Sequence, residues 1–464
     1  MRYLPHTDEE VQVMLRAIGV ESIDDLFEAI PDRLHQSASE LELPPPMSEI
    51  SLRRHLSSLA EANRVMRRDV TSLLGAGCYD HVVPESLNQL LLRAEFLTSY
   101  TPYQGEISQG TTKAIFEFQS MVAELLGMPI ANASMYDGAH AVAEAALMAQ
   151  RTFRRKPRKE VWVAGNVHPD YRQVIQTYLR WQDDVYNEFG TDRQTGRFDL
   201  DALRAEIEDP EQVACVIYQS PNFLGVLEDP TELVEWAHEQ GILVVATFNE
   251  PHAFALTKPP GEFGVDICAG EAMSLGMGPS FGGPALGIFA ARKKQLRSMP
   301  GRLSGRTVDE RGREGYVLTL STREQHIRRE RATSNICTNQ GLMALAAAIY
   351  LSLMGREGLR ELGRLNMARA RYARDLFCSR AVGKPAYEAP FFNEFVVELP
   401  VEARKVIDAC LDRDIIPGFD LGAIDEKWSH HLLVAATEMV DRRSIEDVVD
   451  AIESVLDYNA LSRS

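Results

Sequence analysis

The sequence lacks the cysteine pairs that mark many metal sites and disulfide scaffolds. Its six cysteines are scattered between Cys78 and Cys410 without a Cys-x-x-Cys pair. This pattern is typical of a reduced protein, so we expect a cytoplasmic location and no metal site. The amino terminus has neither the apolar core of a signal peptide nor an arginine-rich transit pattern. No apolar run approaches the roughly 20 residues that span a bilayer, and we expect no membrane segment.

Positive charge is also scarce. The 464 residues carry a formal net charge of -18. A nucleic-acid-binding surface needs clustered positive charge to replace the counterions of phosphates, so this balance argues against a nucleic-acid partner. With 45% hydrophobic and 25% charged residues, the composition is that of a soluble globular protein, and the length allows two or three cores.

Lysine is missing where a cofactor loop would need it. The stretch 270–287, GEAMSLGMGPSFGGPALG, has the glycine density of a loop that closes its backbone around a cofactor. No lysine occurs between Lys258 and Lys293, so nothing in this loop can form a Schiff base with pyridoxal phosphate. The stretch is therefore a dead site, a different site or half of a site.

The chain divides by pattern into three parts. Residues 1–65 are expected to form a helical amino-terminal arm and a connector, because an amphipathic pattern is followed by three consecutive prolines. Residues 66–340 alternate apolar strands with helices from Val161 onward, which indicates an α/β domain with a mostly parallel sheet covered on both faces. Residues 341–464 begin with an alanine-rich helix and are expected to form a smaller α/β domain.

Three segments could carry chemistry. The first runs from Asp137 through Gly138 to His140, at the start of a predicted helix rich in small side chains. Backbone N–H groups at such a start can hold a phosphate. A plain capped helix is the simpler interpretation of an isolated Asp-Gly-Ala, and His140 by itself is more typical of a packed or capping residue.

The second segment is an irregular loop that offers Tyr100, Tyr103, Gln104 and Glu106. Aromatic and polar groups that converge on such a loop indicate a ligand-facing surface, although a simple surface loop has the same composition. The third segment, 321–341, is predicted as a charged helix followed by Thr333, Ser334 and Asn335. The charges favour a solvated or interface helix, whereas the hydroxyls and amide after it could donate hydrogen bonds to a phosphate.

Four separate blocks together resemble one family. They are SYTPYQGEISQGT, NASMYDGAHAVAEA, GMGPSFGGPALGIFA and REQHIRRERATSNICTNQ. Their combination resembles the amino-terminal half of the glycine-cleavage P-protein, the decarboxylating glycine dehydrogenase. The length of the chain resembles that of subunit 1, the alpha chain of the two-subunit form.

The resemblance implies the aspartate-aminotransferase-like fold of type I pyridoxal phosphate enzymes, with a degenerate cofactor site. It places the Schiff-base lysine and the pyridoxal phosphate on a separate beta subunit, leaving no catalytic residue and no covalently bound cofactor here. Met273 or Ser274 would occupy the position of the lysine, and the strand ending near Glu250 lacks the aspartate expected against the pyridine nitrogen. The degenerate pocket would comprise Asp137, Gly138, His140, Ser274, Gly282 and Gly283.

The resemblance also implies how this chain would serve its partners. The hydroxyls and amide of Thr333, Ser334 and Asn335 would reach the phosphate of the partner's cofactor, and the loop with Tyr100 and Tyr103 would reach the partner's pocket. The assembled complex, expected as a heterotetramer, would decarboxylate glycine, release carbon dioxide and transfer the aminomethyl group to the lipoyl arm of H-protein. This chain alone would be inactive.

Two other interpretations compete with this one. A self-sufficient pyridoxal phosphate lyase or aminotransferase would use Lys258, Lys293 or Lys294, although their surroundings indicate loop and surface positions. A non-catalytic scaffold with a relict cofactor fold would share the missing lysine. We also expect Met273 and Phe281 to fill the degenerate pocket, and the glycines of the loop to be needed for close backbone packing.

Overall fold

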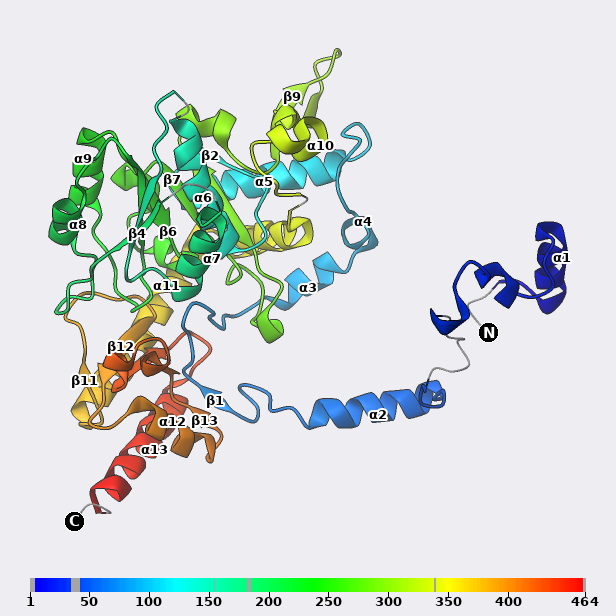
Figure 1. Ribbon diagram of the computed structural model, residues 1–464. Helices are drawn as coiled ribbons and strands as arrows, with labels where there is room; N and C mark the ends of the chain where they lie inside the picture. Colours follow the sequence, from blue (N-terminus) through cyan, green and yellow to red (C-terminus); the bar gives the residue numbers. More distant parts are fainter. Residues whose placement is uncertain (1–4, 35–41, 154, 182–184, 338, 462–464) are drawn as a thin grey trace. The chain divides into compact units, whose positions relative to one another are not determined.

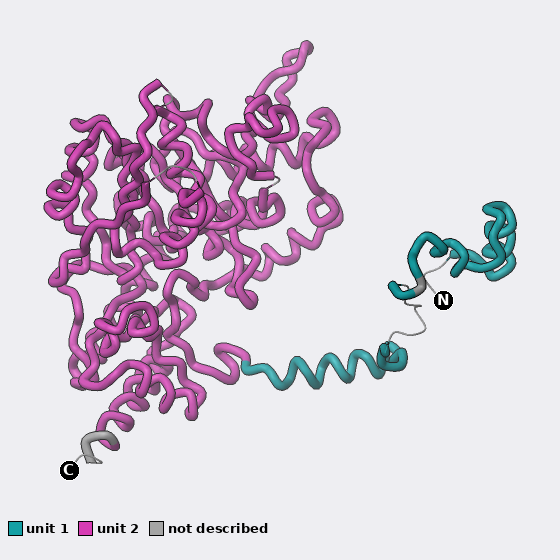
Figure 2. Tube along the Cα trace, in the orientation of Figure 1, with its two compact units in different colours: residues 1–64 teal, residues 65–464 magenta. Residues whose placement is uncertain are grey.

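The computed structural model describes residues 5–34, 42–153, 155–181, 185–337 and 339–461. It contains two compact units, residues 1–64 and residues 65–464 (Figure 2). In the first unit, helices α1 (Asp8–Ile18) and α2 (Glu49–Glu61) begin at the N-caps Thr7 and Ser48. The described part of residues 1–64 thus contains these two helices, and the division of the chain at residue 65 stays a prediction.

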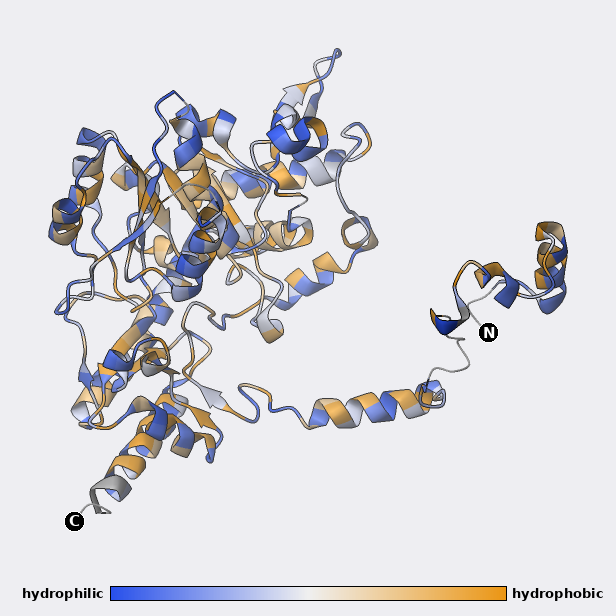
Figure 3. Cartoon of the chain, viewed as in Figure 1, coloured by the Kyte–Doolittle hydropathy of each residue, from blue (hydrophilic) through white to orange (hydrophobic). Residues whose placement is uncertain are grey.

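The second unit (Figure 1) is built on a large sheet. This sheet has seven strands in the order β2-β8-β7-β6-β5-β3-β4. The strands are β2 (Ile130–Ala131), β3 (Glu160–Ala164), β4 (Val185–Phe189), β5 (Val213–Gln219), β6 (Leu243–Thr247), β7 (Ile267–Glu271) and β8 (Gly287–Ala291). Strands β3 to β7 pair in parallel, while β8 and β2 run antiparallel at one edge. The central strands are buried and mostly apolar, as parallel strands covered on both faces should be (Figure 3).

Helices cover this sheet and connect its strands. They are α3 (Glu85–Leu91), α4 (Ala94–Leu97), α5 (Gln109–Leu125), α6 (Gly138–Thr152), α7 (Pro169–Leu179), α8 (Leu200–Glu206) and α9 (Thr231–Glu239). Helix α6 packs against β5 to β8 and against α7. Its alanine-rich buried face allows this close approach, so the start of α6 is held at the ends of the central strands.

A second sheet lies in the carboxyl-terminal part. Its order is β11-β12-β15-β14, all antiparallel. The strands are β11 (Lys384–Pro385), β12 (Glu394–Glu398), β14 (Phe419–Asp420) and β15 (His431–Ala435), and the helices are α12 (Ala403–Leu411) and α13 (Arg442–Leu461). A short parallel pair joins β1 (Thr71–Ser72) to β13 (Ile415–Ile416). The chain just after the first unit is therefore part of this smaller layer.

Helix α11 (Gly341–Ser379) connects the two sheets. Gly355, at φ 57°, interrupts the helical geometry. Side chains before it, such as Tyr350, enter the core of the large sheet, and Phe377 enters the core of the small one. Because α11 belongs to both cores, the division of the chain at residues 340 and 341 stays a prediction. By length and composition alone α11 could also cross a membrane, a test that core helices of soluble proteins pass too.

The charged helix predicted over 321–331 is wrong. The structure has only single turns there, η8 (Ser321–Arg323), α10 (Gln325–Arg328) and η9 (Arg329–Arg331). Leu320 and Arg329 have φ values of 55° and 52°, and such left-handed residues end a helix. This irregular segment follows a hairpin of β9 (Leu303–Val308) and β10 (Glu314–Thr319).

Candidate functional site

The glycine-rich stretch connects β7 to β8 at the edge of the parallel strands. A Cβ added to Gly270 would overlap the carbonyl oxygen of Phe248, and one added to Gly287 would overlap that of Asp137. These two glycines are needed for close backbone packing, as expected. Gly282 and Gly283 are different, because a Cβ on either meets nothing within 4 Å. Close packing therefore does not require glycine at these two positions, and their place in a degenerate pocket stays a prediction.

Met273 is buried, and its side chain belongs to the main core. Ser274 is buried as well, and its hydroxyl donates to Glu250 at 3.3 Å. Phe281, in contrast, is fully exposed. It was expected to fill the degenerate pocket, but its backbone has a left-handed φ of 55° in an exposed turn, which directs that part of the loop into solvent.

The start of α6 holds a carboxylate of this same chain. Gly138 N–H donates to Glu271 Oε2 at 2.9 Å, and the N–H groups of Met273 and Leu286 donate to Glu271 Oε1 at 2.9 and 2.8 Å. Glu271 is buried, which raises the pKa of its carboxyl, while the backbone donors counteract that rise. We call Glu271 with these three N–H groups the α6 anion site.

Asp137 and His140 close the first turn of α6. The Asp137 carboxylate accepts from the His140 N–H at 2.8 Å and lies 2.7 Å from His140 Nδ1. His140 also contacts the rings of Tyr136 and Tyr178 edge-on. His140 is therefore a capping and packing residue, which was the simpler interpretation of its position.

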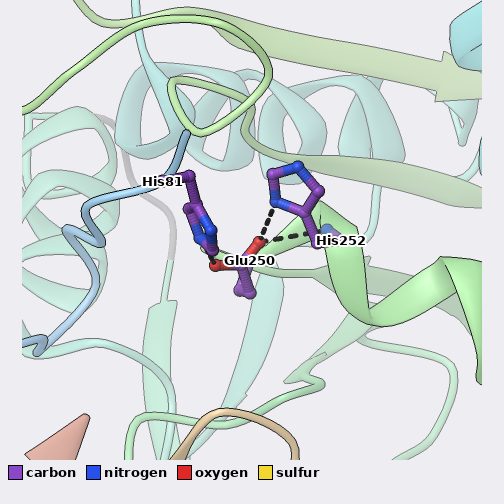
Figure 4. A group of neighbouring side chains, drawn as sticks. All are labelled: His81, Glu250 and His252. Carbon is purple, nitrogen blue, oxygen red and sulfur yellow. Dashed lines mark hydrogen bonds and ion pairs between the residues drawn. The ribbon is translucent and has the colours of Figure 1, made fainter. Parts of the chain in front are cut away.

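The carboxylate of Glu250 contacts two histidines, His81 and His252 (Figure 4). His81 Nε2 lies 2.7 Å from one carboxylate oxygen and His252 Nδ1 lies 2.8 Å from the other. Asn393 donates to Glu250 at 3.1 Å. All three residues in Figure 4 are buried. Glu250 is thus fully engaged in the core and is not free to hold the ring nitrogen of a cofactor.

His81 extends this network to the small sheet. Its Nδ1 lies 2.9 Å from Glu438, which also accepts from Asn366 at 2.9 Å. Burial by itself would lower the pKa of His81, but Glu250 and Glu438 outweigh burial and raise this pKa to about 10. Burial opposes ionisation of Glu250, yet His81 and His252 hold its pKa well below the usual range. His81 is therefore an imidazolium between two buried carboxylates.

The same three residues, His81, Glu250 and His252, could offer ligand atoms to a metal ion, since these atoms lie within 4.8 Å of one another. Each of those atoms already has a hydrogen-bond partner, and the outer nitrogens contact Glu438 and Tyr350. A metal would have to replace the proton that His81 holds between two carboxylates. The geometry favours a protonated network over a metal centre.

None of the lysines near the loop is placed for Schiff-base chemistry. Lys258 is exposed and its ammonium group lies over the ring of Phe263 at 4.2 Å. Lys293 is exposed, and Lys294 pairs with Asp266 at 2.9 Å. The lysines are not placed to form a Schiff base, and the Glu250 carboxylate is occupied by hydrogen bonds. The residues present therefore do not fit a covalently bound pyridoxal phosphate.

A cleft of about 560 Å³ lies beside Thr333, Ser334 and Asn335. Its wall includes Tyr136, Glu144, Leu147, Gln150, Arg151, Pro157, Arg158, Lys159, Tyr178, Ala332 and Ile336. Ser334 donates to Glu144 at 2.8 Å, and Glu144 pairs with Arg151. Within the described part of the chain, the side chains of Thr333 and Asn335 form no hydrogen bond, so they can bind a group from outside.

The segment that carries Thr333 to Asn335 is attached to the start of α6. Tyr136 OH accepts from Cys337 N–H at 2.7 Å and donates to Cys337 O at 2.8 Å. Asn339 donates to Ser134 at 2.8 Å. Two of the four sequence blocks thus meet at this cleft, although they are some 200 residues apart.

The aromatic loop is exposed. Tyr100 and Tyr103 are each 74% exposed, and Gln104 and Glu106 also face solvent. Arg302 lies over the Tyr103 ring at 5.9 Å. Tyr100 and Asn339 line one small cavity of about 40 Å³, which joins this loop to the segment beyond Asn335. The structure therefore brings the two predicted partner-facing segments close together, and Glu271 is not among the described residues that line these two cavities.

The model of the glycine cleavage system P-protein family matches residues 1–452. The chain belongs to this family. It is 45% identical to the probable glycine dehydrogenase (decarboxylating) subunit 1 of Desulfotalea psychrophila over 98% of either chain. A crystal structure of glycine decarboxylase (P-protein) in inhibitor-bound form superimposes with a TM-score of 0.87 at 39% identity, covering 98% of this chain and all of the other.

The fold is that of type I pyridoxal phosphate enzymes. A Burkholderia pseudomallei sphingosine-1-phosphate lyase shares it with a TM-score of 0.65 at 16% identity, covering 91% of this chain and 94% of the other. Members of the glycine cleavage P-protein family act in glycine decarboxylation, and this role is shown for the chain by its family. This chain therefore has the fold of a pyridoxal phosphate enzyme, but its own residues are not placed to bind the cofactor covalently.

Sequence reasoning missed two elements of the site. Glu271 is the last residue of β7 within the glycine-rich stretch, and a carboxylate at the end of a buried strand is the signal that the sequence offers. His81 lies in GAGCYDH, between the arm and the first predicted helix, and nothing in its local pattern indicates contact with Glu250. Only the fold brings residues 81 and 250 together.

Proposed function

We propose that this chain is the alpha subunit of a two-subunit glycine decarboxylase whose beta subunit carries pyridoxal phosphate and its lysine. The single observation that carries this proposal is the combination at one site of a type I fold, a buried internal carboxylate and no lysine. The complex would be a cytoplasmic heterotetramer. The six free cysteines of this chain agree with a reduced compartment.

The residues of this chain would act on the partner's site from outside. Thr333 and Asn335 would donate hydrogen bonds to the phosphate of the partner's cofactor, and Ser334 would position them through Glu144. The exposed Tyr100, Tyr103, Gln104 and Glu106 would cover the partner's pocket and exclude water. Type I fold neighbours support pyridoxal phosphate as the cofactor in general.

The overall reaction consumes glycine and the lipoyl disulfide of H-protein. Glycine loses carbon dioxide, its aminomethyl carbon bonds to one sulfur, and the other sulfur leaves as a thiol. The cofactor, when bound on the partner, supplies the electron sink for the loss of carbon dioxide. This chain's contribution is to orient the reacting groups and the lipoyl arm, which can lower a barrier by several kcal/mol without proton transfer.

Reconstitution tests the proposal. The chain alone, a candidate beta chain alone and the mixture are assayed for glycine-dependent exchange of carbon dioxide with lipoylated H-protein. We expect exchange only in the mixture, with cofactor absorbance between about 400 and 430 nm in samples that contain the beta chain. A beta chain that is fully active alone would reduce this chain to a scaffold. A yellow and active chain by itself would establish the self-sufficient alternative.

A further inference from the structure

The α6 anion site is arranged as phosphate sites are. Helix α6 has 15 residues. Its first turn therefore presents N–H groups that have no partner within the helix, together with the positive end of the helix dipole. Gly138 supplies one donor, and Met273 and Leu286, at the two ends of the connection between β7 and β8, supply two more. Converging N–H groups at a helix start bind anions. Here the anion is the carboxylate of Glu271.

A second feature indicates that the site can hold more than this carboxylate. Tyr171 on α7 is buried, and its hydroxyl has no hydrogen-bond partner among the described residues. The hydroxyl points at Gly138, because a Cβ added to Gly138 would overlap it. Burial and the carboxylates of Glu271 and Asp137 raise the pKa of Tyr171 well above its usual value, so it keeps its proton. A buried donor is thus unused beside the site.

We propose that Glu271 is a built-in substitute for a bound phosphate group. Its carboxylate occupies the donors of the α6 anion site and thereby closes this chain to inorganic phosphate and phosphate monoesters. The Tyr171 hydroxyl is the donor that such a ligand would use in addition. This inference concerns an anion site within the chain and holds whether or not the proposed beta subunit exists.

The test removes the internal carboxylate and supplies an external anion. In Glu271→Ala, three backbone donors face a cavity, and we expect a lower melting temperature than in wild type. Inorganic phosphate should raise that melting temperature by about 2 °C or more, while sodium chloride of equal ionic strength should not. In the wild-type chain, phosphate should change the melting temperature no more than sodium chloride does. Isothermal titration with phosphate checks binding directly.

Matched variants make the outcome specific. Ile288→Ala on β8 opens a fully buried cavity without donors and should lose stability but gain no response to phosphate. Glu271→Ser leaves a smaller polar side chain and provides a second folded variant. Adding Tyr171→Phe to Glu271→Ala should weaken phosphate binding about tenfold, because one donor to a charged group is lost. In wild type, Tyr171→Phe should leave stability unchanged, since its hydroxyl is unpaired.

The proposal is overturned by either of two results. One is a folded Glu271→Ala or Glu271→Ser protein that shows no specific response to phosphate. The other is a wild-type response equal to that of the variants, which would mean that Glu271 does not occupy the site. Both readouts use the isolated chain, so they are independent of decarboxylase activity.

Discussion

Replacing Thr333 and Asn335 together with alanine should weaken retention of pyridoxal phosphate by the reconstituted complex about a hundredfold. The reason is that two hydrogen bonds to a charged phosphate contribute about 1.5 kcal/mol each at the lower end of the usual range. Both side chains form no hydrogen bond within the described chain, and both line the cleft. Equilibrium dialysis of the complex against cofactor-free buffer, with absorbance as readout, measures the loss.

Two further variants separate direct contact from positioning. Thr307→Ala removes an exposed threonine on β9 and should leave cofactor retention unchanged. Ser334→Ala breaks the hydrogen bond to Glu144 and should have a smaller effect than the double variant, because Ser334 acts through the segment. Unchanged retention in the double variant would remove Thr333 and Asn335 from the partner's site.

Replacing His81 with alanine should lower the free energy of unfolding by about 3–5 kcal/mol, because it leaves buried carboxylates without their shared cation. Glu250 and Glu438 both contact the His81 ring. The midpoint of urea unfolding measures the change. His140→Ala is a matched control: its Nδ1 also lies 2.7 Å from a carboxylate, but the side chain is 37% exposed, so its loss should cost about 1 kcal/mol or less.

The same network has a defined dependence on pH. Because the folded pKa of His81 is raised from 6.5 to about 10, its stabilisation is complete below pH 6.5 and is lost as pH rises through 10. The lowered pKa of Glu250 matters at low pH. The stabilisation that its carboxylate gives the folded state is lost when acid protonates it. The difference in stability between wild type and His81→Ala should therefore shrink from pH 6.5 to 10. A difference that is constant over this range would contradict the charged state of His81.

The sequence predicts the sheet well where strands are continuous, mostly apolar runs. Runs such as ACVIYQS and GILVVATF become β5 and β6, because a parallel strand buried on both faces needs no polar side. The charged stretch 321–331 fails for the opposite reason. Its composition permits a helix, but an extended backbone at Glu324 and a positive φ at Arg329 divide it into single turns. Local pattern does not encode such breaks.

Some features of the site can likewise be predicted from neighbouring residues, and others depend on contacts between distant parts of the chain. The missing lysine and the capping role of Asp137 can be read from consecutive residues. The contact between Gly138 and Glu271 joins residues 133 positions apart and depends on how β7 meets α6. Phe281 shows the converse error, since an aromatic residue in a cofactor-like loop suggests pocket filling, whereas its turn exposes it. Long-range packing decides the first case, and the local turn geometry decides the second.

The central claim is that the cofactor chemistry lies on the partner chain, and borohydride reduction tests it directly. Reduction converts a Schiff base into a stable pyridoxyl-lysine, so intact-mass spectrometry of the reduced complex shows which chain carried the cofactor. We predict the pyridoxyl group on the beta chain alone, with the mass of this 464-residue chain unchanged. A pyridoxyl group on Lys258, Lys293 or Lys294 would contradict the claim.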